Sequence, residues 1–447
     1  MSHLAALLLV AAAAATPPEQ ESVTPGTPPE APRTLALADA VRSAVEHQPQ
    51  LLQARAAAEA AAARSDLARS GLLPQLNGTA SYSRETANFT PRPGLTTSAA
   101  RASSSWDTVN FWSFGATLSQ LVFDFGQTSG RWRAALASAD AQRSSERMTR
   151  IQVVLGVEIA YFTARAGKDL VRVARDNLAN QENHLRQVEG FVRAGARPDI
   201  DLAQARTDRA NAEVQLINAQ NAYDTEKAQL AQAMGLEAAT ELDVGDDQLP
   251  PVAGEGERLE PLFAEALANR PDIAALEQQA RAQELTLGSL RGAYLPMLGA
   301  STGIATAGQA LDSTATNWNA TATLTWNLFQ GWATHAQSRE AQANLDAARA
   351  QVALLRQQTR VDVEQSRLAV RAAKQALSAA DVALVNAQQR LRLAERRYET
   401  GVGSAIELGD AQVALTTAAA QRVQAEYSVS TSRAQLLRAL GREVPGA

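Results

Sequence analysis

Of the side chains that often carry catalysis or bind metals, cysteine is absent and histidine is rare in this chain, and their spacing forms no site. Cysteine is absent, which excludes disulfides, thiolate ligands, a cysteine nucleophile and lipid attachment to a cysteine. The histidines are scattered without metal-ligand spacing, at His3, His47, His184 and His335. The segment Gly401-Val402-Gly403 is no phosphate loop, because no strand precedes it and no lysine follows. The sequence therefore predicts no enzyme, no cofactor and no metal site.

One acidic pair has a spacing that could serve a function. Glu407 and Asp410 are three residues apart, so on a helix both carboxylates share one face. They follow Gly401 and Gly403, which indicate a tight turn between antiparallel helices. Repeated around a symmetry axis, such a pair would concentrate cations and repel anions. An ordinary solvated helix face is the alternative, since most exposed acidic pairs have no measurable effect.

Long helices must position this pair. The chain is 45% apolar but only 5% aromatic, with alanine throughout, which is typical of long packed helices rather than a thick globular core. We expect helices over about 126–194 and 331–400, each on the order of 100 Å long. Such helices need partners along their whole length, and alanine permits close coiled packing. The net charge of −5, without basic clusters interleaved with aromatics, argues against a nucleic-acid partner.

The chain contains an internal duplication. Pro49 aligns with Pro271 and Pro74 with Pro296 at one constant offset, and Trp112 with Trp318 and Gly195 with Gly401 at a shorter one. Each copy reads as short helix, helix, strand, loop, strand, very long helix, turn and helix. The expected division is a signal peptide over 1–15, a disordered Pro-rich leader over 16–34, repeat 1 over 35–240, a linker over 241–258 and repeat 2 over 259–442. For the first segment, a frayed Ala-rich helix is the alternative.

Four segments alternate between apolar and polar residues, at about 75–86, 111–123, 297–308 and 317–329. This pattern is typical of membrane barrel strands, although four amphipathic strands could equally form a soluble sheet. No later apolar run is long enough for a transmembrane helix, so strands must provide any membrane contact. The residues expected to face lipid are Trp112, Phe114, Leu118, Trp318, Leu324 and Trp326. An open four-stranded sheet cannot face lipid, so assembly is required; twelve strands from a trimer would leave a wide lumen, whereas eight from a dimer would not.

These features together resemble the TolC-like outer-membrane efflux protein family, also called outer membrane factors. The resemblance covers roughly 35–441 and rests on the duplicated plan, on Leu73-Pro74 and Leu295-Pro296 entering strands, and on the turns at 123–126 and 328–331. It implies a mainly α fold with a small membrane β-barrel, in which long antiparallel α-helical hairpins form a periplasmic tunnel. It also implies a homotrimer in the outer membrane with a twelve-stranded barrel and a long periplasmic extension.

The resemblance further implies a channel of a tripartite efflux or type I secretion system. Its expected partners are a periplasmic adaptor protein, an inner-membrane pump or secretion transporter, and outer-membrane lipid. The expected pore aperture consists of Glu407, Asp410, Asp201 and Tyr398. The expected adaptor-contacting tips are Gly195, Ala196, Arg197, Gly401, Val402 and Gly403, with a plain helical turn as the alternative. Two departures stand out: glycine at 403 cannot supply the arginine that the family often has nearby, and Arg197-Pro198 replaces small or apolar residues.

Overall fold

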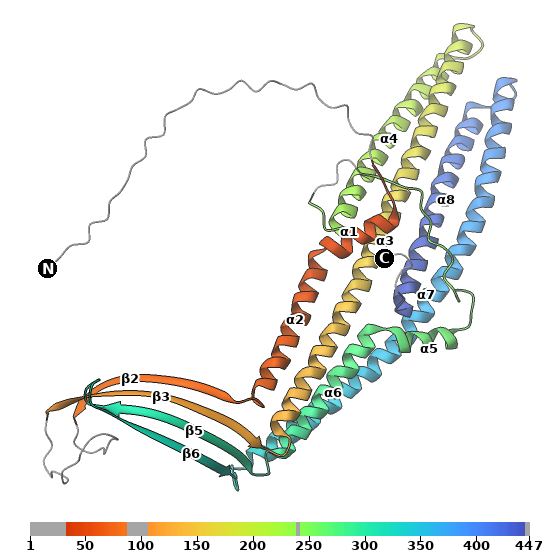
Figure 1. Ribbon diagram of the computed structural model, residues 1–447. Coiled ribbons are helices and arrows are strands. Elements are labelled where there is room, and N and C mark those ends of the chain that lie inside the picture. Colours follow the sequence, from red (N-terminus) through yellow and green to blue (C-terminus); the bar gives the residue numbers. More distant parts are fainter. Residues whose placement is uncertain (1–32, 87–105, 238–241, 443–447) are drawn as a thin grey trace, which may run out of the picture.

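The computed structural model describes residues 33–86, 106–237 and 242–442 (Figure 1). The expected signal peptide and the leader up to residue 32 lie outside these residues. In the first copy the helices are α1 (Leu37–His47), α2 (Pro49–Ser70), α3 (Gln127–Arg193) and α4 (Asp199–Ala233). In the second copy they are α5 (Leu259–Asn269), α6 (Pro271–Gly292), α7 (Ala333–Glu399) and α8 (Ala405–Leu440).

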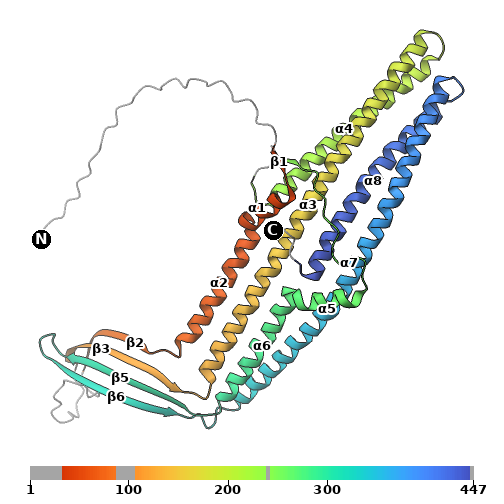
Figure 2. The same ribbon diagram turned by 45° about the vertical axis from the view of Figure 1, so that its right-hand side comes forward.

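The two longest helices, α3 and α7, set the length of the molecule. Each has 67 residues and is therefore roughly 100 Å long. In both views a sheet lies at one end of the helical body and two hairpin turns lie at the other (Figure 1, Figure 2). Near the sheet, α6 contacts both α3 and α7, and toward the turns α3 contacts both α4 and α8. The helix α3 thus joins the two copies along its length.

The sheet has the order β2-β3-β5-β6 and is antiparallel throughout, with β2 (Gln75–Thr86), β3 (Thr108–Phe123), β5 (Met297–Gly308) and β6 (Thr314–Thr325). Its register unites the two copies, because Ala116 of β3 pairs with Ile304 of β5, which pairs with Trp318 of β6. Alternation then puts five of the expected lipid-facing residues on one face of the sheet: Trp112, Phe114, Leu118, Trp318 and Leu324.

The last strand was predicted to extend further toward the C-terminus than it does in the structure. The prediction was 317–329, but β6 stops at Thr325, which pairs with Met297, the first residue of β5. The chain before Met297 is the Leu295-Pro296 turn, so no partner backbone remains for Trp326. The indole of Trp326 instead donates to the carbonyl of Tyr294, in the turn between α6 and β5, at 3.1 Å. Trp326 is therefore not a strand residue.

A second, two-stranded sheet corrects the expected leader and linker. Residues 33 and 34 belong to β1 (Arg33–Leu35), which pairs in parallel with β4 (Leu242–Val244). The expected leader therefore does not include residues 33 and 34, and the expected linker is not irregular throughout. Beyond β4, the Asp247 carboxylate accepts hydrogen bonds from the Tyr161 hydroxyl and the Leu37 amide, both at 2.8 Å. These bonds fasten the linker to α3 and to the start of α1.

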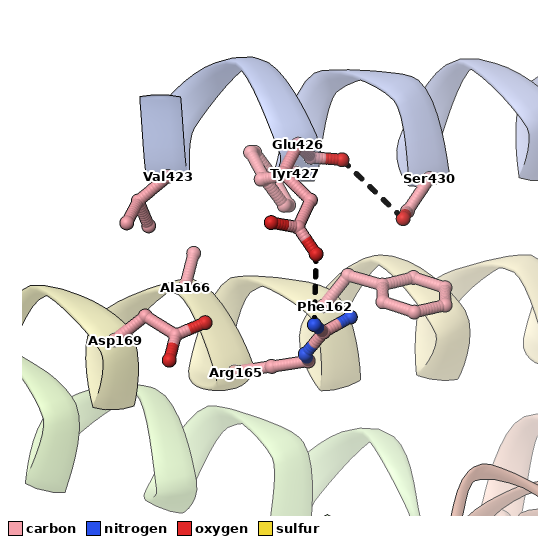
Figure 3. A pocket seen from close by; sticks show the side chains of 8 residues that line it. All are labelled: Phe162, Arg165, Ala166, Asp169, Val423, Glu426, Tyr427 and Ser430. Atoms are coloured by element: carbon pink, nitrogen blue, oxygen red, sulfur yellow. Dashed lines mark hydrogen bonds and ion pairs between the residues drawn. The ribbon is translucent and has the colours of Figure 1, made fainter. Parts of the chain in front are cut away.

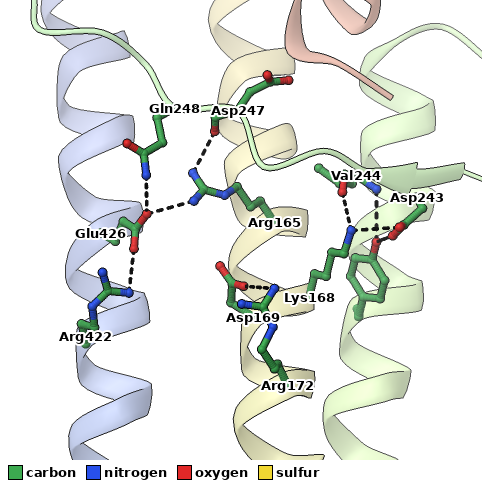
Figure 4. A network of polar contacts seen from close by, with 11 residues as sticks. Arg165, Lys168, Asp169, Arg172, Asp243, Val244, Asp247, Gln248, Arg422 and Glu426 are labelled. Carbon is green, nitrogen blue, oxygen red and sulfur yellow. Dashed lines mark hydrogen bonds and ion pairs between the residues drawn. The ribbon is translucent and has the colours of Figure 1, made fainter. Parts of the chain in front are cut away.

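Charged side chains join the two hairpins where the linker crosses them. Arg165 of α3 reaches Glu426 of α8 at 2.9 Å, and both are largely buried (Figure 3). Arg165 also donates to the Asp247 carbonyl, and Gln248 donates to Glu426, so the linker takes part in the same network (Figure 4). Lys168 bonds Asp243 on the other side of α3. Because the partners come from α3, α8 and the linker, the network fixes the hairpins relative to each other.

Each hairpin ends against the junction of the two short helices of its own copy. Gly235 follows α4 with φ of +76°, and a Cβ atom there would lie 2.8 Å from the carbonyl carbon of His47. Gly441 follows α8 with φ of +68°, and a Cβ atom added there would lie 3.0 Å from backbone atoms of Arg270. Only glycine permits both this conformation and this approach. The repeated glycine is therefore a packing requirement that the duplication preserves.

Candidate functional site

The hairpin turns at the far end carry the expected tip residues. Gly195 and Gly401 have φ of +73° and +76°, and neither has a neighbouring atom within 4 Å of an added Cβ. Their amides close the helix ends by bonding the Val192 and Tyr398 carbonyls. Beside the second turn, Val402 is 74% exposed and Ile406 is 76% exposed. The end of the molecule therefore presents apolar side chains around two tight turns.

Arg197 connects the two turns. Its guanidinium lies over the Tyr398 ring, with 4.5 Å from Cζ to the ring centroid, and its Nη2 donates to the Gly403 carbonyl at 3.4 Å. Gly403 itself has no room for a side chain, because a Cβ would lie 2.9 Å from the backbone of Arg397 and Tyr398. Arg197 of the first hairpin thus contacts the backbone of the second turn at Gly403. The sequence prediction missed this contact: Arg197 and Gly403 are equivalent positions of the two copies, and equivalence in a repeat does not by itself imply contact.

Tyr398 is the centre of the apolar cluster behind the turns. It is 1% exposed and packs edge-on against His184 and Phe191, with centroid distances of 5.4 and 6.3 Å. The Tyr398 hydroxyl and the His184 Nδ1 are both buried without a hydrogen-bond partner. Burial lowers the pKa of His184, against the opposing effects of Asp208 and Asp201. His184 is therefore neutral in this cluster at neutral pH and contributes packing, as expected of an isolated histidine.

Tyr398, one of the expected aperture residues, is buried in this cluster, whereas the three acidic ones lie close to it but have different surroundings. Glu407 forms an ion pair with Arg397 at 3.3 Å, and its backbone amide is capped by the Ser404 hydroxyl. Asp410 has an exposed side chain that lines a groove between α4 and α8. Asp201 lines the same groove, 3.9 Å from Arg197. The structure therefore brings Asp201 and Asp410 to one groove and pairs Glu407 with a cation outside it.

This groove has a volume of about 650 Å³. Its walls are α4 and α8, and its floor is α3, which contributes Asn177 and Gln181. The floor is tied to the walls by amides: Gln181 donates to Gln412 at 3.0 Å, and Asn177 donates to Gln215 at 3.2 Å. Sequence reasoning did not single out these amides, because glutamine and asparagine recur throughout the helices. Within the described residues, no group of His, Cys, Asp or Glu side chains could hold a metal ion.

The fold has close counterparts among solved structures. A crystal structure of a membrane protein from Pseudomonas aeruginosa superposes with a TM-score of 0.79 and 23% identity, over 91% of this chain and 92% of that one. The Campylobacter jejuni CmeC outer membrane channel gives a TM-score of 0.79 and 19% identity, over 91% and 85% of the two chains. At these identities the likeness establishes the fold, that of outer-membrane channels with a long helical extension. Among the described residues, no helix is long and apolar enough to cross a membrane.

Sequence comparison identifies the family. The model for outer membrane efflux proteins matches residues 40–236 and 262–442, so the chain belongs to that family. The probable efflux pump outer membrane protein SepC of Pseudomonas putida is 28% identical over 284 residues, which are 63% of this chain and 56% of SepC. Outer membrane protein OprJ of Pseudomonas aeruginosa is 25% identical over 83% of this chain and 77% of OprJ. The matched part therefore spans little more than half of SepC. The predictions of the family, of a mainly α fold with strands and of the outer-membrane location are confirmed.

Proposed function

We propose that this protein is the outer-membrane channel of a tripartite efflux or type I secretion system and conducts passively what an inner-membrane transporter and a periplasmic adaptor deliver. The proposal rests on one observation: in a member of this family, an amphipathic antiparallel sheet is joined to helices roughly 100 Å long. The proteins OprJ and SepC carry outer-membrane and efflux-pump names, which supports the same role. The role is that of a conduit and not of an enzyme.

Closure of the sheet requires further copies of the chain. The edge strands β2 and β6 are 12 residues each and pair on one side only. Unpaired backbone groups cannot face lipid, so β6 of one copy pairs with β2 of the next in our proposal. Three copies give twelve strands and a wide lumen. The face carrying Trp112, Phe114, Leu118, Trp318 and Leu324 then contacts lipid, and the opposite face, rich in serine, threonine and asparagine, lines the lumen.

The hairpin turns are the periplasmic tip in this arrangement, and the adaptor contacts residues 195–197 and 401–403. We expect Gly401→Trp to abolish export, because it places a bulky ring in the open space beside the turn. Gly401→Asn is the matched control, since asparagine tolerates positive φ and adds little bulk. Resistance to an exported compound measures export, and trimer yield on native gels measures assembly. Loss of trimer in Gly401→Trp would show that the turn is structural and not a docking surface.

The aperture proposal is tested by single-channel conductance of the purified trimer in a planar bilayer. Glu407→Gln together with Asp410→Asn is expected to lower the preference for cations and to weaken block by multivalent cations. Because Arg397 already neutralises Glu407, Asp410→Asn alone should account for most of the change. Glu407→Gln alone is the control and should change selectivity little. Unchanged selectivity and block in the double variant would mean that these carboxylates lie away from the conducting path.

A further inference from the structure

Charge is almost absent from the four strands of the large sheet. Among the residues of β2, β3, β5 and β6 only Arg84 and Glu85 are charged. Alternation points these two neighbours to opposite faces, and Arg84, which pairs with Asn110, lies on the face of Trp112. The face proposed to contact lipid therefore carries one charge, and that charge is positive. Because a charged side chain within the hydrocarbon is costly, the position of Arg84 along the sheet decides what it can do.

Arg84 lies toward the end of the sheet that points away from the helices (Figure 1). Strand β2 begins at Gln75, close to the end of α2, and Arg84 is two residues before its last residue, Thr86. From Leu76, the first apolar residue of this face, the strand rises about 26 Å to Arg84. With the tilt usual in membrane barrels this is roughly 20 Å along the membrane normal, which is most of an apolar band about 25 Å tall. Arg84 is therefore at the outer boundary of the hydrocarbon.

An aromatic pair marks the same boundary independently. Tyr82 and Trp112, which pair with each other two residues nearer the helices, have ring centroids 4.6 Å apart. The Tyr82 hydroxyl donates to the Asn110 side chain at 3.1 Å, and Asn110 is the pairing partner of Arg84. Tyrosine and tryptophan are enriched where a membrane barrel passes from hydrocarbon to headgroups. The two rings thus end the apolar surface, and Arg84 and Asn110 begin the headgroup layer.

The guanidinium of Arg84 is oriented but not neutralised. Its Nε donates to the Thr108 hydroxyl at 2.9 Å, which is its only hydrogen bond to a described residue. No described carboxylate forms an ion pair with it, and the adjacent Glu85 points to the other face. The edge formed by Nη1 and Nη2 therefore keeps its N–H groups, which form the fork that matches a phosphate. A positive charge that borders an apolar surface is suited to an amphiphile with an anionic head.

We propose that Arg84 binds a phosphate of a lipid in the outer leaflet of the outer membrane, and that Thr108 positions the guanidinium for this contact. The acyl chains of that lipid then lie along the Tyr82–Trp112 pair. A lipid is favoured over a soluble anion, because only a lipid brings a phosphate and an apolar chain to adjoining parts of this surface. The inference rests on the proposed channel, since it requires this face of the sheet to contact lipid.

The test is native mass spectrometry of the purified full-length protein in detergent, titrated with diphosphoryl lipid A. We expect saturable binding, and Arg84→Gln should lower the apparent association constant at least about fivefold. Arg84→Lys keeps the charge without the fork and should recover only part of the loss. The matched control is Arg371→Gln, which removes the same charge from an exposed position of α7, roughly 60 Å along the helix from its start beside the sheet. Binding by this control should equal that of the unchanged protein.

The site is refuted if Arg84→Gln binds lipid A as well as the unchanged protein does. An equal loss in Arg371→Gln would mean diffuse attraction by charge, and displacement of lipid A by excess inorganic phosphate would mean a plain anion site; either result overturns the proposal. If circular dichroism shows that Arg84→Gln is misfolded, Thr108→Val decides, since it removes only the hydroxyl that holds the guanidinium and should weaken binding several-fold. Conductance in planar bilayers keeps the channel role distinct. Protein that conducts while Arg84→Gln binds normally refutes only the site, and protein that neither conducts nor resists carbonate extraction refutes both.

Discussion

Gly235→Ala is expected to destabilise the protein by about 2–5 kcal/mol. Positive φ costs an alanine roughly 1–2 kcal/mol, and forcing atoms into a packed site costs about 1–3 kcal/mol more. The new Cβ would meet backbone atoms, the carbonyl of His47 at 2.8 Å and Cα of Gln48 at 2.9 Å, which cannot rotate away. The apparent melting temperature in detergent, followed by far-ultraviolet circular dichroism, measures the loss.

Gly195→Ala separates the two contributions. Its φ of +73° nearly equals that of Gly235, but nothing lies within 4 Å of the added atom. The Gly195→Ala variant should therefore lose only the stability that positive φ costs an alanine. Its melting temperature should fall by clearly less than that of Gly235→Ala. Gly441→Ala against Gly401→Ala repeats the comparison in the second copy, where the close contact is with Arg270. Equal losses within each pair would show that the approach of the helix junction is not tight in solution.

Ile304→Arg is expected to cost about 2–4 kcal/mol per chain in the membrane and to reduce the recovery of carbonate-resistant trimer from outer membranes. Ile304 lies near the middle of β5, between Ala116 and Trp318, on the face assigned to lipid. Leu324 also lies on that face, but it is one residue from the C-terminal end of β6, where the strand approaches the helices. Because the cost of arginine falls toward the interface, Leu324→Arg should have a smaller effect.

Ala305→Arg is the matched control for the sheet. Ala305 is the next residue of β5, pairs with Asn317, and points to the opposite face. An arginine on the lumen side remains in water, so trimer recovery should stay near that of the unchanged protein. A similar loss in Ile304→Arg and Ala305→Arg would indicate general damage to the sheet. Normal recovery of Ile304→Arg would count against the assignment of this face to lipid.

Most of the fold could be predicted from the sequence because its signals are local and occur twice. Strand alternation sets the bounds of β2 and β5, and Pro49 and Pro271 occupy the first turns of α2 and α6. The prediction was wrong where alternation continued past the end of the neighbouring strand, at Trp326. It also missed β1 and β4, because three-residue strands carry no periodicity.

The candidate site was harder to predict, since its contacts join residues that are far apart in the chain. The spacing of Glu407 and Asp410 implied a common role, but Arg397 pairs with Glu407 and leaves Asp410 to the groove. From the sequence, Arg197 is an unsuitable residue for a turn, but in the structure its guanidinium lies over the Tyr398 ring. Gln181 looks like any other helical glutamine, and only its burial and its unpartnered oxygen single it out. These properties depend on packing between helices and have no sequence pattern.

The pairing of β3 with β5 also constrains how the chain is made. These two strands are adjacent in the sheet, yet the whole α3–α4 hairpin is synthesised between them. At a translation rate of about 5–20 residues per second, β3 is complete roughly 9–35 s before β5 emerges. During that delay β3 presents an amphipathic edge, which is a template for aggregation. Until β5 has been made, the first half of the duplicated chain therefore has an open strand edge that pairing with another chain could occupy.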